Sequence, residues 1–310
     1  MRIVFMGTPE FALPSLEKLL ASDHDVLAVV TRPDRPRGRG LREASPPIKV
    51  LAEGHGLPVL QPEKLREESF VRKLSELKAD LLVVVAFRIL PREVYTMPPK
   101  GTIDLHPSLL PKYRGAAPIH WAIINGERQT GVTVFYIGEK VDAGDTILQR
   151  TVPIGPDETA GELSQRLADI GAQVLLEVVD AIDLGQVSGT VQSEGEPSPA
   201  PKLKREDGRI DWTKSASQLK DLIRGLNPWP GAFTTYGGQI LKIHRALVVD
   251  QSDQGARPGQ VLRADPRQGI LVNTGKAQLY LQEVQLEGRK RMSSAEFLRG
   301  FHLKEGDLFA

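Results

Sequence analysis

A carboxyl group and an imidazole lie two residues apart near the middle of the chain. Thr102–His106 alternates polar and apolar residues, which predicts a short β-strand with Asp104 and His106 on the same face. Pro107 cannot donate a hydrogen bond to a neighbouring strand, so regular pairing should stop there. An imidazole beside a carboxyl group can move a proton or donate a hydrogen bond to a developing negative charge.

A second carboxyl group follows the next predicted strand, Gly131–Gly138. Asp142 stands just before a turn, where it is well placed to orient a histidine. An isolated Asp–His pair is more often structural than catalytic. The presence of Asp142 favours the catalytic interpretation. If Asp142 is hydrogen-bonded to His106, it fixes the imidazole tautomer and favours the imidazolium.

The segment after His106 places leucines among chain-breaking residues. Ser108–Gly115 contains Pro111 and a glycine but also the adjacent leucines Leu109 and Leu110. A loop with two leucines needs something apolar to cover. Loops that follow strand ends are where open α/β sheets bind their ligands.

The elements around this segment predict an α/β sheet in the N-terminal part. Apolar runs alternate with stretches of helical periodicity, which is typical of parallel strands with covering helices. The predicted strands include Arg2–Met6, Val26–Val30 and Leu81–Phe87, and the predicted helices include Phe11–Leu20, Glu67–Leu77 and Thr159–Leu184. The first predicted strand is followed by Gly7-Thr8-Pro9, which is not a dinucleotide-binding glycine pattern.

The C-terminal third has a different pattern. Gly185–Glu206 is rich in Gly, Ser and Pro and predicts a linker. Short β-type runs then recur at a spacing that suggests a small barrel, compatible with an oligonucleotide-binding type. They are Ala232–Tyr236, Ile240–Val249, Gly259–Ala264, Gly269–Val272 and Leu279–Gln285. We predict a first domain over 1–188, a linker over 189–206 and a second domain over 207–310.

Composition sets the outer limits on function. The 310 residues are 40% hydrophobic and include no cysteine, which excludes disulfides and thiol chemistry. No apolar run approaches the ~20 residues of a transmembrane helix. Residues 1–200 hold 22 Lys and Arg against 27 Asp and Glu, and residues 201–310 hold 18 against 12. The positive C-terminal part suggests a polyanionic partner.

Five arginines fall between Arg32 and Arg42, together with two prolines and two glycines. This composition predicts an irregular, cationic loop. Such a loop is either a solvated connection or an arm that contacts phosphate groups, because arginine pairs with phosphate through its planar fork.

The motif Asp-x-His-x-Ser-Leu-Leu-Pro-x-Tyr-Arg-Gly at 104–115 is followed by Gly-x-Thr at 131–133 and Asp-x-Gly at 142–144. This combination resembles the formyltransferase family that uses 10-formyltetrahydrofolate. The whole chain, including its C-terminal third, resembles the branch that formylates methionyl-tRNA. The family has Asn where this chain has Asp104.

The resemblance implies a fold and a set of site residues. The fold is a Rossmann-like, mostly parallel α/β domain followed by a small OB-like β-barrel domain. The implied catalytic residues are Asp104, His106 and Asp142. The residues implied to contact folate are Ser108, Leu109, Leu110, Pro111, Phe87, Arg88, Ile89 and Leu90. The residues implied to contact tRNA are Arg37, Arg39 and Arg42.

The resemblance also implies the reaction. A formyl group would pass from 10-formyltetrahydrofolate, a co-substrate, to the free amino group of initiator methionyl-tRNA for translation initiation, without a metal. We expect tetrahydrofolate and the tRNA as partners, no membrane association, a monomer and a cytoplasmic location. One alternative acceptor is an amino-sugar nucleotide. Another alternative is a catalytically weakened tRNA-binding homologue, since an ionised Asp104 would repel an oxyanion. If Asp104 is desolvated near Asp142, it keeps its proton and donates an O–H instead.

Overall fold

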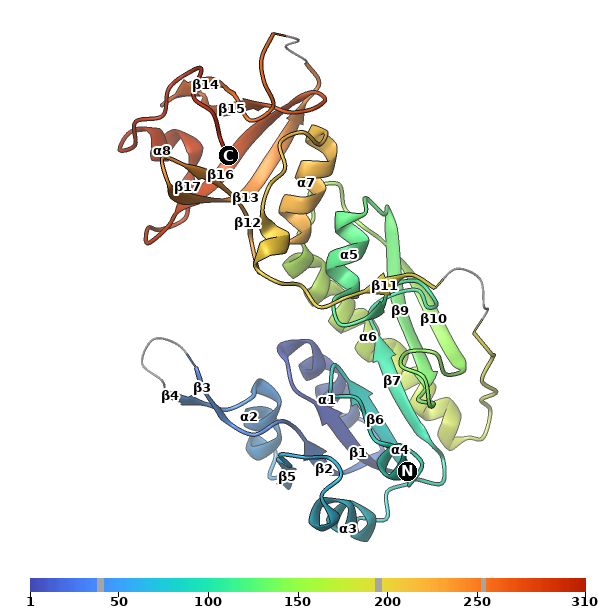
Figure 1. Cartoon of the computed structure of the whole chain (residues 1–310). Helices are drawn as coiled ribbons and strands as arrows, with labels where there is room; N and C mark the ends of the chain where they lie inside the picture. Colours follow the sequence, from blue (N-terminus) through green and yellow to red (C-terminus); the bar gives the residue numbers. More distant parts are fainter. Residues whose placement is uncertain (38–41, 193–196, 252–254) are drawn as a thin grey trace. The chain divides into compact units, whose positions relative to one another are not determined.

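The computed structural model describes residues 1–37, 42–192, 197–251 and 255–310, which form two compact units (Figure 1). The first unit comprises Met1–Gly115, Gln129–Pro153 and Ser164–Ala200, and the second comprises Ala116–Arg128, Ile154–Leu163 and Pro201–Ala310. The second unit includes an early stretch of the sequence because α5 (Pro118–Ile124) packs against α7 (Ala216–Gly225). The domain boundaries at 188 and 206 stay a prediction.

A seven-stranded sheet in the order β10-β9-β7-β6-β1-β2-β5 forms the centre of the first unit. Neighbouring strands from β5 to β7 pair in parallel. Strand β9 pairs antiparallel with β7 on one side and with β10 on the other. The strands are β1 (Arg2–Gly7), β2 (Asp25–Val30), β5 (Val59–Leu60), β6 (Leu81–Val85), β7 (Thr102–His106), β9 (Gln129–Tyr136) and β10 (Thr146–Pro153). The predicted Rossmann-like, mostly parallel sheet is therefore confirmed.

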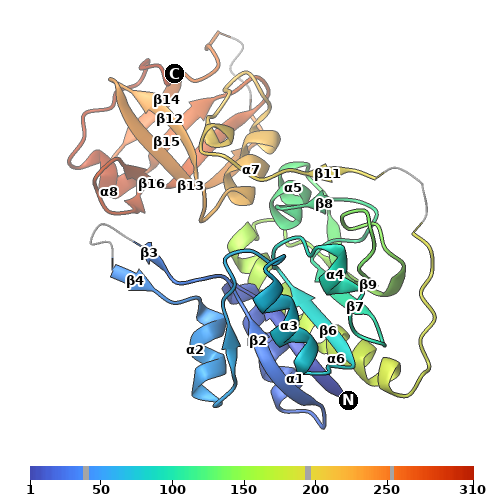
Figure 2. The same cartoon turned by 60° about the horizontal axis from the view of Figure 1, so that its bottom comes forward.

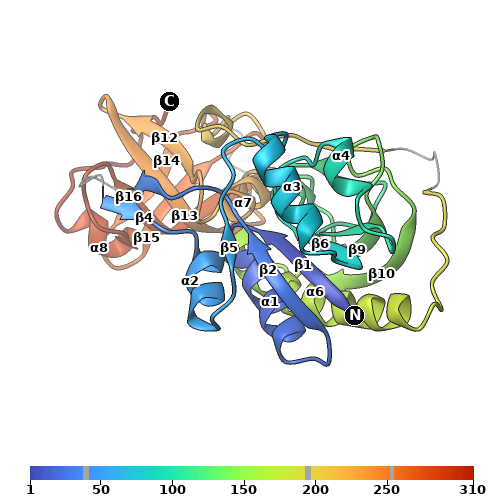
Figure 3. The ribbon, with the colours of Figure 1, turned by 90° about the horizontal axis from the view of Figure 1, so that it is seen from below.

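Helices cover both faces of this sheet, which explains why its central strands are apolar throughout. Figure 3 shows α3 (Glu68–Glu76) and α4 (Arg92–Tyr95) on one side and α1 (Leu13–Leu20) and α6 (Ala160–Asp183) on the other. Strand alternation assigns Val4 and Met6 to the α3 side, where they share a buried cluster with Phe70 and Leu74. The first unit also contains helix α2, which spans Pro47–Gly54, and a 3₁₀ turn, which spans Glu10–Ala12.

The order of the strands reverses between β1 and β6, and this reversal defines where a ligand is expected. The chain leaves β1 through Gly7, leaves β6 through Ala86 and leaves β7 through Pro107. Ala86 has a φ of 50°, in the left-handed region that residues other than glycine seldom adopt. Such strained positions occur mainly at functional sites.

The second unit contains an antiparallel sheet in the order β12-β13-β16-β15-β14 (Figure 2). Its strands are β12 (Ala232–Tyr236), β13 (Gln239–Val249), β14 (Val261–Asp265), β15 (Gly269–Asn273) and β16 (Gln278–Leu286), with β17 (Met292–Ser293) paired to β16. The five predicted strands are confirmed, and so is the hairpin turn at Gly237-Gly238, where both φ angles are positive.

The last residues of the chain join the two edges of this sheet. On the β14 side, Val261 N donates to Asp307 O (2.8 Å). On the β12 side, Thr235 and Ala310 exchange two backbone hydrogen bonds of 2.9 and 3.0 Å. The sheet thus closes into the small barrel that the sequence predicted. Helix α8 (Ser294–Leu298) and a 3₁₀ turn at Glu206–Gly208 complete the unit.

The arginine-rich stretch has more regular structure than predicted. Arg35–Arg37 (β3) pairs antiparallel with Arg42–Ala44 (β4), so the expectation of an irregular loop was wrong at these positions. A two-stranded ribbon is bonded along one side only, so it tolerates the proline at 36. Figure 2 shows the ribbon extending away from α2. Arg37 and Arg42 are partners in register, and Arg39 lies outside the described residues.

Among the helices that the structure describes, none combines the length and apolar character needed to cross a membrane.

Candidate active site

Three predicted catalytic residues meet at the carboxyl end of β7. Asp104 and His106 come from the strand itself, and Asp142 comes from the connection between β9 and β10. His106 Nδ1 lies 3.9 Å from Asp142 Oδ2, and both side chains are largely buried. One donor atom from each of the three residues lies within 4.8 Å of the others, a spacing at which a metal ion could also be held. The catalytic roles, and the expectation of no metal, stay predictions.

The tautomer of His106 is set by a backbone carbonyl. His106 Nε2 lies 2.9 Å from Tyr113 O, and a carbonyl can only accept, so Nε2 carries the proton and donates it. Nδ1 of the neutral ring is then unprotonated on the side of Asp142. The separation of 3.9 Å is too long for a hydrogen bond, so the condition under which Asp142 would fix the tautomer is not met.

Burial also decides the charge state of His106. It lowers the pKa of the imidazole, against the opposing influence of the Asp142 carboxylate and the Tyr113 carbonyl. The neutral ring is therefore favoured, where the sequence suggested an imidazolium. Asp142 Oδ2 accepts its hydrogen bond from Gly115 N at 2.8 Å instead.

Asp104 is in an environment that opposes ionisation. Burial of the carboxyl group raises its pKa well above the ordinary value, and the negative charge of Asp142 raises it further. A backbone hydrogen bond from Leu105 acts in the opposite direction and is the smallest of the three influences. Asp104 therefore keeps its proton at a pH where an exposed aspartate would have lost it.

The Ser108–Pro111 segment is held in place by two polar side chains of the antiparallel strands. Thr133 Oγ1 donates to Ser108 O (2.7 Å) and accepts from Leu110 N (3.2 Å). Gln149 Nε2 donates to Leu110 O (2.8 Å) and to Thr133 Oγ1 (3.0 Å). Thr133 belongs to the Gly-x-Thr motif of the sequence. Gln149 carried no signal, because it reads as one more polar residue of an edge strand.

Gly131 shows why this motif begins with glycine. A Cβ atom at this position would lie 2.2 Å from Arg150 O and 2.5 Å from Leu109 Cδ2. Non-bonded atoms do not approach so closely, so any side chain here would push the Ser108–Pro111 loop away from β9.

The second group of predicted folate contacts, Phe87–Leu90, has mixed surroundings. Arg88 donates to the carbonyls of Pro62 and Glu63 and lies over the Phe87 ring. Leu90 belongs to the core cluster on the α3 side of the sheet. Ile89 is 76% exposed, so it is the side chain of this group most open to a ligand. Contact with folate stays a prediction for this group and for Ser108–Pro111.

Comparison with protein families gives the class of this chain. Residues 1–179 match the family described as "Formyl transferase", and residues 202–302 match "Formyl transferase, C-terminal domain". Fold, site and family matches together define a formyltransferase with two parts.

Two relatives narrow the class. The chain is 48% identical over 307 residues to the methionyl-tRNA formyltransferase of Pelotomaculum thermopropionicum, covering 99% of this chain and 97% of the relative. It is 47% identical over 307 residues to the enzyme of that name from Geobacter sulfurreducens, covering 99% and 96%. The chain belongs to the methionyl-tRNA formyltransferase family.

A solved structure shares the fold at much lower sequence similarity. WlaRD, a sugar 3N-formyltransferase crystallised with dTDP and 5-N-formyl-THF, superposes with a TM-score of 0.68 and 16% identity. The match covers 94% of this chain and 99% of that one. At this identity the likeness concerns the fold alone.

Proposed function

We propose that this chain transfers the formyl group of 10-formyltetrahydrofolate to the free amino group of initiator methionyl-tRNA. The observation that carries the proposal is the cluster of Asp104, His106 and Asp142 at the carboxyl end of β7. Two relatives with 47–48% identity over nearly the whole chain bear the name of this activity. A folate co-substrate is supported by the sugar formyltransferase of the same fold, whose crystal structure was determined in the presence of 5-N-formyl-THF.

The reaction needs a base for the attacking amine and an acid for the leaving nitrogen. The amine attacks the formyl carbon, a C–N bond forms, and the carbonyl becomes a tetrahedral oxyanion. His106 Nδ1, unprotonated in the neutral ring, takes a proton from the amine. The resulting imidazolium is stabilised by Asp142 at 3.9 Å and returns the proton to N10 as the C–N10 bond breaks. Formyl-methionyl-tRNA and tetrahydrofolate are the products.

Asp104 serves as the hydrogen-bond donor to the oxyanion. An ionised carboxylate would repel the negative charge, but a protonated carboxyl group offers an O–H in place of the N–H of an asparagine. Because the pKa of Asp104 is raised, this protonated form persists to higher pH than it would in an exposed aspartate. A catalytically weakened homologue is the alternative, and it requires Asp104 to be ionised.

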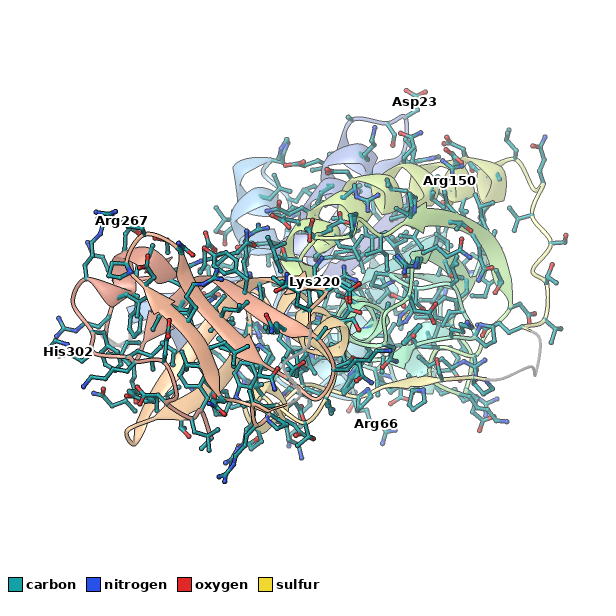
Figure 4. All side chains as sticks on the ribbon, turned by 90° about the horizontal axis from the view of Figure 1, so that it is seen from above. Asp23, Arg66, Arg150, Lys220, Arg267 and His302 are labelled. Carbon is teal, nitrogen blue, oxygen red and sulfur yellow. The ribbon has the colours of Figure 1, made fainter. Side chains whose placement is uncertain are left out.

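Binding of the tRNA falls to basic parts of the chain. We assign the phosphate contacts to Arg37 and Arg42 of the β3–β4 ribbon, to Arg39, which lies outside the described residues, and to the positively charged stretch 201–310. Side chains such as Arg267 and His302 point outward from this unit (Figure 4). The proposed enzyme acts as a cytoplasmic monomer, with the domains divided near residues 188 and 206.

A comparison of acceptors tests the function. The chain is incubated with 10-formyltetrahydrofolate and either initiator methionyl-tRNA or a dTDP-linked amino sugar, and formylated product is quantified. We expect product from the tRNA and only background from the sugar nucleotide. Formylation of the sugar nucleotide alone would show that it, and not methionyl-tRNA, is the acceptor. Tight tRNA binding without formylation of either acceptor would support the catalytically weakened homologue.

A further inference from the structure

The predicted linker contains a buried glutamine. Gln192 follows α6 in a stretch whose neighbour Val191 is 76% exposed, yet Gln192 itself is only 8% exposed. Burying an amide is costly unless its polar atoms are bonded, so its partners define its purpose. Gln192 Oε1 accepts from Arg114 Nη2 at 2.7 Å, and Nε2 donates to Asp142 O at 3.1 Å and to Gly144 O at 2.8 Å.

The partners leave one orientation for this amide. Two carbonyls can only accept and a guanidinium can only donate, so the oxygen of Gln192 must face Arg114 and the nitrogen must face residues 142 and 144. Neither glutamate nor leucine could reproduce this pattern.

Gln192 thereby connects the two loops that complete the candidate active site. Arg114 stands between Tyr113, whose carbonyl accepts from His106, and Gly115, whose N–H donates to Asp142. The other end of the glutamine holds the backbone of Asp142 itself. The Gln192 side chain thus links the loop that is bonded to the His106 imidazole with the loop that carries the Asp142 carboxylate.

Both loops adopt backbone conformations that need external support. Tyr113 has a φ of 60° and Asp142 a φ of 51°, in the left-handed region that residues other than glycine seldom adopt, although asparagine and aspartate adopt it more often than most. Such conformations persist where the surrounding structure over-determines them. The two donors of Gln192 lie on carbonyls within the Asp142–Gly144 turn.

The same stretch of chain holds the Tyr113 loop at a second point. Tyr113 N donates to Ser198 Oγ, and Arg114 N donates to Ser198 O, both at 2.9 Å. Pro199–Ala200 (β11) then pairs in parallel with Arg114–Gly115 (β8). The segment between the two family-matched regions is therefore bonded to the candidate active site at Gln192 and at Ser198–Ala200.

We propose that Gln192 is a positioning residue that fixes Asp142 relative to His106 without touching the reacting atoms. The inference rests on the proposed formyl transfer, because it assigns Gln192 a part in that reaction. If Gln192 acts through Asp142, its loss matters only while the Asp142 carboxylate is present.

The test is a double-mutant cycle with Gln192→Leu and Asp142→Asn. Single-turnover formylation of methionyl-tRNA should fall about 10–100-fold in Gln192→Leu, with unchanged KM for both substrates, because small misplacements of catalytic groups have effects of this size. In the Asp142→Asn background, Gln192→Leu should have less than about a 2-fold further effect. Gln186→Leu, an exposed glutamine of the same segment, should match the unaltered chain.

A second readout is independent of formylation. The titration of His106 is followed by NMR in the same four variants, with thermal unfolding as the check on folding. Because the Asp142 charge raises the pKa of His106, displacing Asp142 should lower it, and Gln192→Leu should shift it in the same direction as Asp142→Asn. An unaltered rate and titration in a folded Gln192→Leu would overturn the inference. Absence of formylation by the unaltered chain would refute the proposed function, and the titration would still decide the inference.

Discussion

At the scale of single residues, the site depends on how burial distributes protons. Burial lowers the pKa of His106 and raises that of Asp104, so both groups are favoured in their uncharged forms while Asp142 supplies a neighbouring carboxylate. Two carboxyl groups and an imidazole in one small volume can therefore offer a base and an acid at the same pH. The difference between Asp104 and the family's Asn becomes a difference in pH dependence.

Asp104→Asn should change the alkaline side of the pH–rate profile. The amide donates at every pH, while Asp104 donates only below its raised pKa, so the rate of the unaltered chain should fall as pH rises and that of the variant should not. The loss at high pH should approach about 10²–10³-fold, the usual effect of removing one oxyanion donor. Single-turnover formylation from pH 6 to 9 measures this. A variant slower at every pH would refute the protonated-donor role.

Asp104→Asn should also stabilise the fold at neutral pH. A raised pKa in the folded state means that the unfolded chain binds fewer protons between the ordinary pKa near 3.8 and the raised value. Stability of the unaltered chain therefore falls as pH rises through this window, and the asparagine variant escapes that loss. Thermal unfolding should show a higher Tm for the variant at pH 7.5 and converging values near pH 4. Parallel curves would contradict the assignment.

At the scale of elements, the sequence predicted what periodicity controls. The alternation in Thr102–His106, the apolar run before Ala86 and the five C-terminal strands all correspond to elements of the structure, within a few residues. The sequence did not predict which residues far apart in the chain are hydrogen-bonded to one another. Nothing in the order of residues indicated that Tyr113 O would hold His106, or that a Gly/Ser/Pro-rich stretch would bury Gln192. Such contacts depend on how distant loops meet after folding.

Gly131→Ala should damage the loop that carries Ser108–Pro111. The added methyl group would meet the Arg150 carbonyl and Leu109, so β9, β10 or the loop must shift, at a cost of about 3 kcal/mol in unfolding free energy. Chemical denaturation measures this cost. Gly54→Ala is the matched control, because a Cβ atom there meets nothing within 4 Å. Equal stability of the two variants would refute the close approach of β9 and the loop.

At the scale of the whole molecule, charge is divided between the parts of the chain. The first 200 residues carry a net −5 and the last 110 a net +6, while the arginine-rich ribbon adds a local positive region to the acidic part. A substrate as large and as charged as tRNA is bound mainly through its phosphates, and the affinity of such contacts depends on salt.

Replacing Arg37, Arg39 and Arg42 together with Ala should flatten the salt dependence of tRNA binding. Each phosphate contact contributes about 0.7–0.9 to the slope of log affinity against log salt, so the slope should decrease by about 2–3. Filter binding or fluorescence titration from 50 to 300 mM salt would measure it. A triple Ala variant at the exposed Arg66, Arg72 and Arg92 carries the same charge change and should keep a steeper slope. Equal slopes in the two variants would show that the ribbon does not contact the tRNA phosphates.

The central claim is that His106 and Asp142 act as one unit in formyl transfer. The most direct measurement is the single-turnover rate of methionyl-tRNA formylation for His106→Ala, Asp142→Ala and the double variant. We predict that each single change lowers the rate by about 10²–10⁴-fold, and that the double variant is no slower than the slower single one. Single variants that keep the unaltered rate, or losses that multiply in the double variant, would contradict it.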